Sequence, residues 1–407
     1  MKFLCRIGAM FVIAVVLFST GCIPEEFYLR ADMSRPDAAP LKIAAVLPMS
    51  GANRISAEQM AEGLQMAEQH INLNSHSGKT RVILKIFDSK GSAAGAWAAV
   101  EAAAKWGASG VIAGYSTAEV SAIIPHAVRL RMPVMIPLAT SNEHSAISPF
   151  VFRNSYTDFQ QSEMLANYLF HWRQVKFLGI FIDESGDAVY QSSIARDVNQ
   201  AFRNLGGTIT ATSIAKLEPS DRDIVNMLKS DPEAILLTCG GKAAAKLIIR
   251  LRKAGFTGII CGADNWDDSE LISNLDNFKT GDCLFTAFFN DENDSKEYID
   301  FKKAFRKRFF HSPGACETQS YDALKLLVIG FSNAETLIDF ERNWCSIRQH
   351  QGAAALYTML PKGEIDRTIY INTIGIRREG RKLKPFSRFS HKLQYSKLIQ
   401  YSPDYYK

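Results

Sequence analysis

Hydroxyl side chains follow two short apolar segments of the chain, at the point where each apolar run stops. The runs span Gly110–Ala113 and Pro133–Ile136, and they are followed by Ser116, Thr117 and Thr140. Apolar runs without polar alternation are typical of parallel strands that helices cover on both faces. The carboxyl ends of such strands are where open α/β sheets bind ligands, beside helix N–H groups that favour an anion. The sequence therefore predicts that these hydroxyls hold a carboxylate-sized anion.

No recognisable catalytic motif accompanies these hydroxyls. The sequence has no G-x-S-x-G turn, no H-E-x-x-H helix, no P-loop and no G-x-G-x-x-G after a strand. Ser116 has no histidine at a recognisable partner position, and neither C-x-x-C nor a zinc-type Cys/His spacing occurs. We therefore expect a binding protein and not an enzyme, without a cofactor or a metal ion.

Length and composition indicate a folded protein of two domains. The chain has 407 residues, which is too long for one compact core. Its 47% hydrophobic and 22% charged residues are those of a globular protein and not of a disordered one. The net charge is +5, and removal of residues 1–21 takes away Lys2 and Arg6 and leaves +3. That charge is too small to indicate nucleic-acid binding, and we read the basic stretch at 377–384 as a solvated hairpin.

The first 21 residues have the pattern of a secretory signal peptide. The apolar core at Ile7–Phe18 is too short to span a bilayer permanently. It leads to Ser19-Thr20-Gly21-Cys22, which resembles a bacterial lipobox, although Ser19 stands where leucine is usual; ordinary secretory cleavage nearby is the alternative. We expect lipidation of Cys22, a flexible tether over residues 22–40, and no membrane anchor other than the lipid.

Five cysteines remain after residue 22, an odd number that leaves at least one thiol unpaired. Cys239 and Cys261 both end strand-like runs and could be neighbours. Free buried thiols are the simpler expectation.

Apolar strands alternate with helical segments in two series. The first series runs from Leu41–Leu47 to Pro133–Ile136, and the second from Lys176–Ile182 to Cys283–Phe288. Such alternation predicts parallel sheets with right-handed crossovers, here in two α/β lobes that face each other. A late strand at Thr368–Ile376 is expected to return to one of the two sheets.

A set of short motifs, in order and spacing, resembles the type I periplasmic binding proteins, and within them the leucine/isoleucine/valine-binding group of ABC importers. The motifs are Leu47-Pro-Met-Ser-Gly51, Gly63…Ala67…Ile71-Asn72, Asp88, Pro133 to Thr140, Phe152-Arg153…Asp158…Gln160, Gly262-Ala-Asp-Asn-Trp266, Tyr321-Asp322-Ala323 and Gly363-Glu364. The resemblance spans about Leu41 to Pro385. It implies two flavodoxin-like lobes with parallel sheets, joined by a hinge of three crossings.

The resemblance also implies domain limits. The N-terminal lobe would consist of residues 41–157 and 288–350, and the C-terminal lobe of residues 158–287 and 351–385. Residues 386–407 would form a C-terminal tail.

Roles for individual residues follow from the same resemblance. In that group the first lobe holds the carboxylate of an α-amino acid, and acidic residues hold its ammonium group. Carried onto this chain, the ligand-binding residues are Ser116 or Thr117, Leu138 and Ala139 through the main chain, Thr140, Asp158, Tyr190, Asp264 and Trp266. Asp264 occupies the position of the ammonium-binding acid, Asp158 is a second acid near the hinge, and Tyr190 lies near the stacking aromatic. The alternatives are helix capping for Asp264, hydrogen bonding within the hinge for Asp158, and packing at the rim of the cleft for Trp266. Thr140 is expected both to bind the ligand and to cap a short helix at Asn142–Ala146.

The chain departs from the pattern of the group at three positions. Cys239-Gly240-Gly241 replaces a tyrosine that many relatives carry near position 240. Leu138 is bulkier than the usual residue, and Gln191 replaces the usual glycine after Tyr190. These departures leave the side-chain class of the ligand open.

Two functions remain in view. The first is a lipid-anchored receptor on the periplasmic face of a bacterial membrane, which binds an amino acid or a similar zwitterion and partners an ABC permease. The second is a regulatory or sensory lipoprotein of the same fold that acts through a protein partner. Asp264 together with Thr140 favours the first, and the missing tyrosine favours the second.

Overall fold

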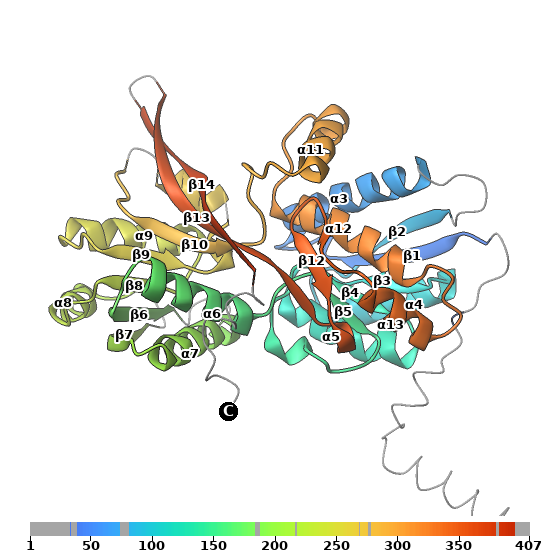
Figure 1. Ribbon diagram of the computed structural model, residues 1–407, viewed down its shortest axis with the longest axis horizontal. Coiled ribbons are helices and arrows are strands. Elements are labelled where there is room, and N and C mark those ends of the chain that lie inside the picture. The colour runs from blue at the N-terminus through green and yellow to red at the C-terminus, as the bar shows by residue number, and fades with distance from the viewer. Residues whose placement is uncertain are drawn as a thin grey trace, which may run out of the picture.

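The computed structural model describes residue 33 and residues 39–73, 81–183, 188–215, 218–267, 269–275, 278–379 and 382–394. Two α/β lobes lie side by side in this part of the chain (Figure 1). The predicted signal peptide and Cys22 lie outside the described residues. No helix within the described ranges is both long and apolar enough to cross a membrane.

The first lobe is built on a five-stranded parallel sheet with the order β2-β1-β3-β4-β5. Its strands are β1 (Leu41–Leu47), β2 (Val82–Asp88), β3 (Gly110–Ile112), β4 (Val134–Ile136) and β5 (Val151–Arg153). The crossover helices are α3 (Arg54–Leu73), α4 (Ala93–Trp106) and α5 (Thr117–Arg129). Side chains of α4 and α5 cover one face of the sheet and α3 covers the other, which explains the unbroken apolar runs of the strands.

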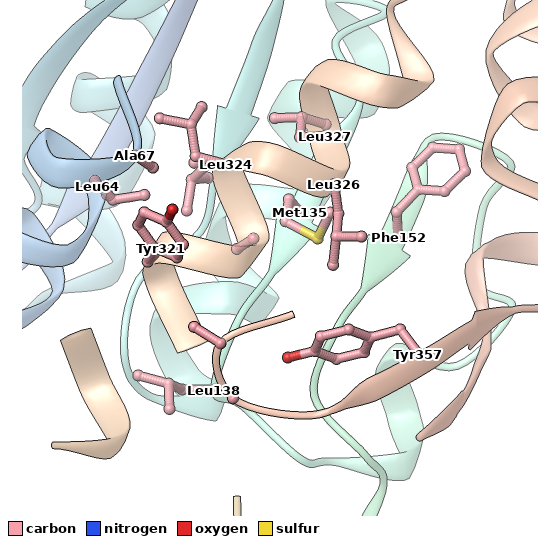
Figure 2. Close-up of a cluster of buried hydrophobic side chains, with 14 of the residues drawn as sticks. Leu64, Ala67, Met135, Leu138, Phe152, Tyr321, Leu324, Leu326, Leu327 and Tyr357 are labelled. Atoms are coloured by element: carbon pink, nitrogen blue, oxygen red, sulfur yellow. The ribbon is translucent and has the colours of Figure 1, made fainter. Parts of the chain in front are cut away.

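Three helices from the last third of the chain complete the first lobe. They are α11 (Lys296–Phe309), α12 (Ala315–Gly330) and α13 (Leu337–Cys345). Figure 2 shows the apolar side of α12, with Leu324, Leu326 and Leu327, among side chains of α3 and of the strands β4 and β5. The first lobe therefore depends on residues that follow the whole second lobe in the sequence.

The second lobe contains a mixed sheet with the order β11-β12-β13-β10-β9-β8-β6-β7, and β14 pairs with β13. The parallel strands are β6 (Phe177–Asp183), β7 (Thr208–Ala215), β8 (Ala234–Leu237), β9 (Ile259–Gly262) and β10 (Cys283–Ala287). The helices α6 (Asp158–Asn167) and α7 (Ala188–Asn204) cover one face, and the other face is covered by α8 (Asp221–Lys229), α9 (Gly241–Lys253) and α10 (Ser269–Asn274). The sheet is mixed because β13 (Ile365–Glu379) runs antiparallel to β10.

The third crossing between the lobes lies within β13 and not at residues 350/351, where we expected it. The short strands β11 (His350–Gln351) and β12 (Leu356–Met359) pair with each other, and β12 pairs with residues 365–367 of β13. The side chains of Tyr357 and Met359 belong to the apolar core of the first lobe. Residues 370–373 of β13 then pair with β10 in the second lobe. Residues 351–365 therefore pack with the first lobe, which corrects the expected limit.

The predicted late strand lies within β13, which continues into a hairpin with β14 (Lys382–Gln394). Figure 1 shows this hairpin projecting beyond the second lobe. In the basic stretch, residues 377–379 end β13 and residues 382–384 begin β14, and these residues pair with each other. Residues 386–394, expected as part of a tail, instead belong to the paired strand β14.

A buried arginine connects the three crossings. Arg367 is 1% exposed, and its guanidinium donates to the carbonyl oxygens of Asn154 (2.8 Å) and Phe288 on the other two crossings. The guanidinium carbon lies 5.3–5.5 Å from the ring centres of Tyr156, Phe288 and Tyr357. This position places the three crossing segments in one packed unit at the hinge.

The cysteines Cys239, Cys261, Cys283, Cys316 and Cys345 are all free thiols. The first three are buried, and burial raises the pKa of the Cys239 thiol to about 12. Cys239 and Cys261 do not form a disulfide.

Candidate functional site

The predicted ligand-binding residues come from the ends of strands and the starts of helices at the hinge side of both lobes. Thr140 follows β4 in the first lobe, and Asp158 begins α6 directly after the first crossing. Tyr190 lies in the first turn of α7, and Asp264 begins a short 3₁₀ helix (Asp264–Trp266) after β9. The carboxyl ends of parallel strands meet at one edge of each sheet, so this arrangement is the one expected for a ligand site in an α/β fold.

Asp264 presents a half-buried carboxylate that is held by hydrogen bonds. Its Oδ1 accepts from the Tyr190 hydroxyl and from Nε2 of Gln161 at 3.0 Å. Burial raises the pKa of Asp264, while the hydrogen bonds from Tyr190 and Gln161 act in the opposite direction. The structure therefore brings Asp264 and Tyr190 together, and it does not use Asp264 as a helix cap.

Asp158 is a second acid in the same cluster, and it is almost fully buried. Its N–H donates to the Thr140 carbonyl at 2.8 Å, and its carboxylate accepts a hydrogen bond from the Thr140 hydroxyl. Burial raises its pKa to about 7, and the negative charge of Asp264 contributes to the increase. A positive charge placed beside a carboxyl group with such a pKa favours its ionised form and lowers the pKa.

Gln161 joins the two acids and was not identified from the sequence. Its Nε2 lies 3.2 Å from Asp158 Oδ1 and 3.0 Å from Asp264 Oδ1. Its Oε1 accepts from the N–H of Asp264 (3.2 Å) and from the Thr286 hydroxyl (2.8 Å). This one amide therefore fixes both carboxylates. Gln161 lies three residues after Asp158 and therefore on the same face of the helix. This spacing is the one feature of the sequence that could have indicated its role.

The structure separates the roles of Ser116 and Thr117. Ser116 caps α5: its Oγ accepts from the N–H of Glu119, and its own N–H and hydroxyl donate to the Glu119 carboxylate. Glu119 is 3% exposed and also accepts from the Ser89 hydroxyl. The Thr117 hydroxyl, in contrast, has no hydrogen-bond partner among the described residues. The Ser-x-x-Glu capping box was readable in the sequence and would have favoured Thr117.

The segment after β4 is buried up to the hinge. Leu138 and Ala139 are 7% and 5% exposed, and the Leu138 side chain belongs to the first-lobe core shown in Figure 2. The Ala139 carbonyl accepts from the Ser155 hydroxyl at 3.0 Å. Ser141, and not Thr140, caps the following 3₁₀ turn, and the Thr140 hydroxyl instead donates to the Asp158 carboxylate.

Trp266 is a core residue of the second lobe and not a residue at the rim of the cleft. Its side chain is fully buried, and its Nε1 donates to the Cys239 carbonyl at 2.8 Å. A Cβ atom at Gly262 would lie 2.2 Å from the indole, so strand β9 packs directly on the ring. Trp266 therefore fixes the turn that carries Asp264.

Glycine at position 240 is required by a close contact with the same turn. A Cβ atom there would lie 2.6 Å from the Asn265 carbonyl oxygen. The main chain before α9 therefore lies against the residue next to Asp264, at the place where the related group carries a tyrosine. A separate cavity of about 190 Å³ lies beyond Cys239 and is lined by Phe181, Asp183, Lys246 and Arg250, among others; neither site acid lines it.

The two lobes are in contact beside the acid cluster. Asn142, in the first lobe, donates through Nδ2 to Asp197 of α7 at 3.0 Å, and its Oδ1 accepts from the N–H of Phe159. The charge of Asp197 also raises the pKa of Asp158. The buried Arg153 lies on the first-lobe side, with Nη2 donating to the Ser141 carbonyl at 3.2 Å and Nε 4.0 Å from Glu364. The acids therefore stand at a junction of the lobes, and the charge of the buried Arg153 acts on Asp158 without forming an ion pair with it.

Comparison with known proteins assigns the chain to a family. A family model described as periplasmic binding protein matches residues 40–359. The Leu/Ile/Val-binding protein homolog 3 of Brucella melitensis is 26% identical over 240 residues, which make up 57% of this chain and 63% of that protein. The chain thus spans less than two thirds of the length of that relative.

Solved structures share the fold of both lobes. The leucine binding protein LivK of Thermotoga maritima matches with a TM-score of 0.70 and 21% identity, over 87% of this chain and 98% of that chain. The branched-chain amino acid transporter substrate binding protein LivJ of Streptococcus pneumoniae, in complex with isoleucine, matches with a TM-score of 0.70 and 18% identity, over 86% and 100%. The expected α/β fold of two lobes is confirmed. Because the family model covers most of the chain, this protein belongs to the periplasmic binding protein family and has its type I fold.

Proposed function

We propose that this protein is an extracytoplasmic solute-binding lipoprotein that delivers an amino acid, or a similar small zwitterion, to an ABC permease. The observation that supports this function best is the pair of carboxylates, Asp158 and Asp264, which one amide joins at the junction of the lobes. Among the described residues neither acid forms an ion pair with a cationic side chain, and two such desolvated acids are suited to an ammonium group, because an unpaired charge in a site of low polarity costs several kcal/mol.

The ligand's two charges are assigned to different elements. The ammonium group is placed at Asp264, with Asp158 as the second acid and Tyr190 beside them. The carboxylate is placed at the start of α5, where the first N–H groups of the helix and the Thr117 hydroxyl are available. Thr140, whose hydroxyl donates to Asp158, is assigned to the ligand carboxylate as well, and the main chain at Leu138 is assigned to the ammonium group. No part of this assignment requires bond making or breaking, in keeping with a binding protein.

A regulatory lipoprotein of the same fold is the second candidate. Two observations favour it: the Glu119 carboxylate already occupies the N–H of Ser116, which reduces the capacity of this edge for an anion, and Cys239-Gly240-Gly241 replaces an aromatic contact. Such a protein would act through a protein partner and would not bind free amino acids.

A ligand screen with a charge variant tests the first function. Calorimetric titration of the mature protein with the common amino acids should give at least one ligand. Asp264→Asn should weaken that ligand ten- to a hundredfold, because a hydrogen bond to a charged group contributes about 1.5–3 kcal/mol. Asp300→Asn, an exposed acid on α11, is the matched control and should leave the affinity unchanged. The absence of any ligand, or equal affinity in both variants, would favour the regulatory function.

The carboxylate side of the site is tested by three hydroxyl variants in the same titration. Thr117→Ala should weaken binding by about three- to tenfold, the effect of one hydrogen bond of about 1 kcal/mol. Thr140→Ala should weaken it by a similar factor. Ser116→Ala should lower the melting temperature through loss of the α5 cap with a smaller effect on affinity. A larger loss of affinity in Ser116→Ala than in Thr117→Ala would reverse the assignment.

The affinity should depend on pH because of Asp158. Its pKa is about 7 in the free protein, and an ammonium group beside it favours the ionised form. Below pH 7, binding must therefore release a proton, and the affinity should fall by up to about tenfold for each pH unit lowered. Titrations at pH 5.5, 6.5 and 7.5 measure this slope, and Asp158→Asn should flatten it. A pH-independent affinity in the unsubstituted protein would exclude Asp158 from the ammonium site.

The lipid anchor is proposed for Cys22, which lies outside the described residues. Cys22→Ser in the full-length chain should move the protein from the membrane fraction to the soluble periplasmic fraction of the producing bacterium. Mass spectrometry of the unsubstituted mature protein should find residue 22 at the N-terminus, with an acyl modification. A membrane-bound Cys22→Ser variant, or a different mature N-terminus, would contradict the lipoprotein assignment.

A further inference from the structure

Three potential metal ligands meet on the first lobe, away from the acid cluster at the hinge. They are Glu62 of α3, His311 in the turn after α11, and Glu317 in the first turn of α12. One ligand atom from each residue lies within 4.8 Å of the other two. Figure 1 shows α3 beside α12, with α11 next to them. The three residues are therefore brought together by tertiary packing and not by a local motif.

Glu317 is the fixed member of this group. It is 1% exposed, and its Oε2 accepts from the N–H of Gly314 at 2.9 Å, which caps α12. A Cβ atom at Gly63 would lie 2.1 Å from the Glu317 carbonyl oxygen, so α3 and α12 are in direct contact at this point. The buried carboxylate therefore stands in a defined position relative to Glu62, one residue away from Gly63. A buried carboxylate calls for a positive charge nearby.

The hydrogen bonds of His311 orient its other ring nitrogen toward the acids. Nδ1 lies 3.1 Å from the Ser312 carbonyl oxygen, which can only accept, so Nδ1 carries hydrogen. Nε2 then lies 2.9 Å from Oε2 of Glu62. In the neutral ring, Nε2 presents a lone pair to a carboxylate oxygen, so a proton or a cation must lie between them. A histidine that donates from one nitrogen to a carbonyl and offers the other to a metal ion is the usual arrangement in metal sites.

We propose that Glu62, His311 and Glu317 bind a divalent transition metal ion, for which Zn²⁺ is the best match, and that the ion ties the turn after α11 to α3 and α12. Imidazole nitrogen and carboxylate oxygen are both zinc donors, and three protein ligands leave the fourth tetrahedral position to water. Zinc requires ligand distances of about 2.0–2.2 Å, so the ligand atoms must approach one another further. The side chains of Glu62 and His311 are 30% and 45% exposed and are free to make this adjustment.

The competing explanation is a plain ion pair between protonated His311 and Glu62. In that pair the protonated imidazole also attracts the Glu317 carboxylate, and the pair has no preference for zinc. Titration of metal-free, untagged mature protein with ZnCl₂ at pH 7.5 distinguishes the two. The proposal expects one binding event with a micromolar or tighter Kd and a rise in melting temperature with added zinc. It also expects CoCl₂ to give visible absorption bands of four- or five-coordinate cobalt.

Matched variants locate the site. His311→Ala changes an exposed side chain and Glu62→Gln a half-buried one of nearly the same shape, so both should fold, as circular dichroism will verify, and both should weaken zinc at least tenfold. His126→Ala, on α5 of the same lobe and beside Trp97, is the control and should bind zinc like the unsubstituted protein. Asp264→Asn should also retain zinc, which separates this site from the amino-acid site.

Three results would overturn the proposal. They are no saturable zinc binding by the unsubstituted protein, a zinc affinity in His311→Ala and Glu62→Gln that is unchanged from that of the unsubstituted protein, and loss of binding in His126→Ala. The first would leave the ion pair as the complete explanation of the contact. The other two would place the bound zinc elsewhere on the chain.

Discussion

The buried guanidinium of Arg367 is the contact on which the arrangement of the two lobes depends. A protein of this topology must bring three separate crossings together, and each crossing exposes main-chain carbonyls that a β-sheet no longer satisfies. Arg367 donates to Asn154 and Phe288 from the other two crossings and to the Thr368 carbonyl on its own. Tyr156 and Phe288 stack at 4.3 Å beside it and exclude water. A buried charge is stable only with such partners, so the carbonyl groups of the crossings stabilise the Arg367 guanidinium. The guanidinium in turn fixes the crossings relative to one another. Asp158 follows the first crossing directly, so the position of the site is set by this hinge.

The electrostatics of the site connect ligand binding to the arrangement of the lobes. Asp158 and Asp264 are desolvated, the negative charge of Asp264 raises the pKa of Asp158, and both carboxylates accept from the Gln161 amide. A cationic group between them removes that repulsion. The α5 terminus, on the other lobe, offers partial positive charge to an anion. The proposed zwitterionic ligand is complementary to both lobes at once, and it would stabilise the state in which the lobes are close in proportion to its preference for that state.

The sequence predicts those parts of the structure that depend on contacts between residues close together in the chain. Apolar runs ending in hydroxyls identified β3 and β4, and the strand–helix alternation identified both lobes, because burial on two faces leaves a clear signature within a few residues. The capping box of Ser116 was equally local. In contrast, Gln161 acquires its role from Asp264, which is 103 residues away, and nothing in its own segment indicates that contact. The third crossing was misplaced for the same reason: Tyr357 and Met359 are apolar in either lobe, and only their partners decide which core they enter.

The separation of the residues along the chain also explains why the proposed metal ligands could not be identified from the sequence. His311 and Glu62 are separated by 249 residues, so no spacing rule for zinc applies to them. The fold brings them together because α12, which follows the entire second lobe, packs on α3 of the first. That packing needs Gly63, whose missing side chain lets the two helices touch at Glu317. The same contact that closes the core of the first lobe therefore sets the spacing of the three ligand side chains. A site of this kind depends on how the two separate stretches of the chain assemble into the first lobe. The residues that form it are therefore not marked by a motif in the sequence.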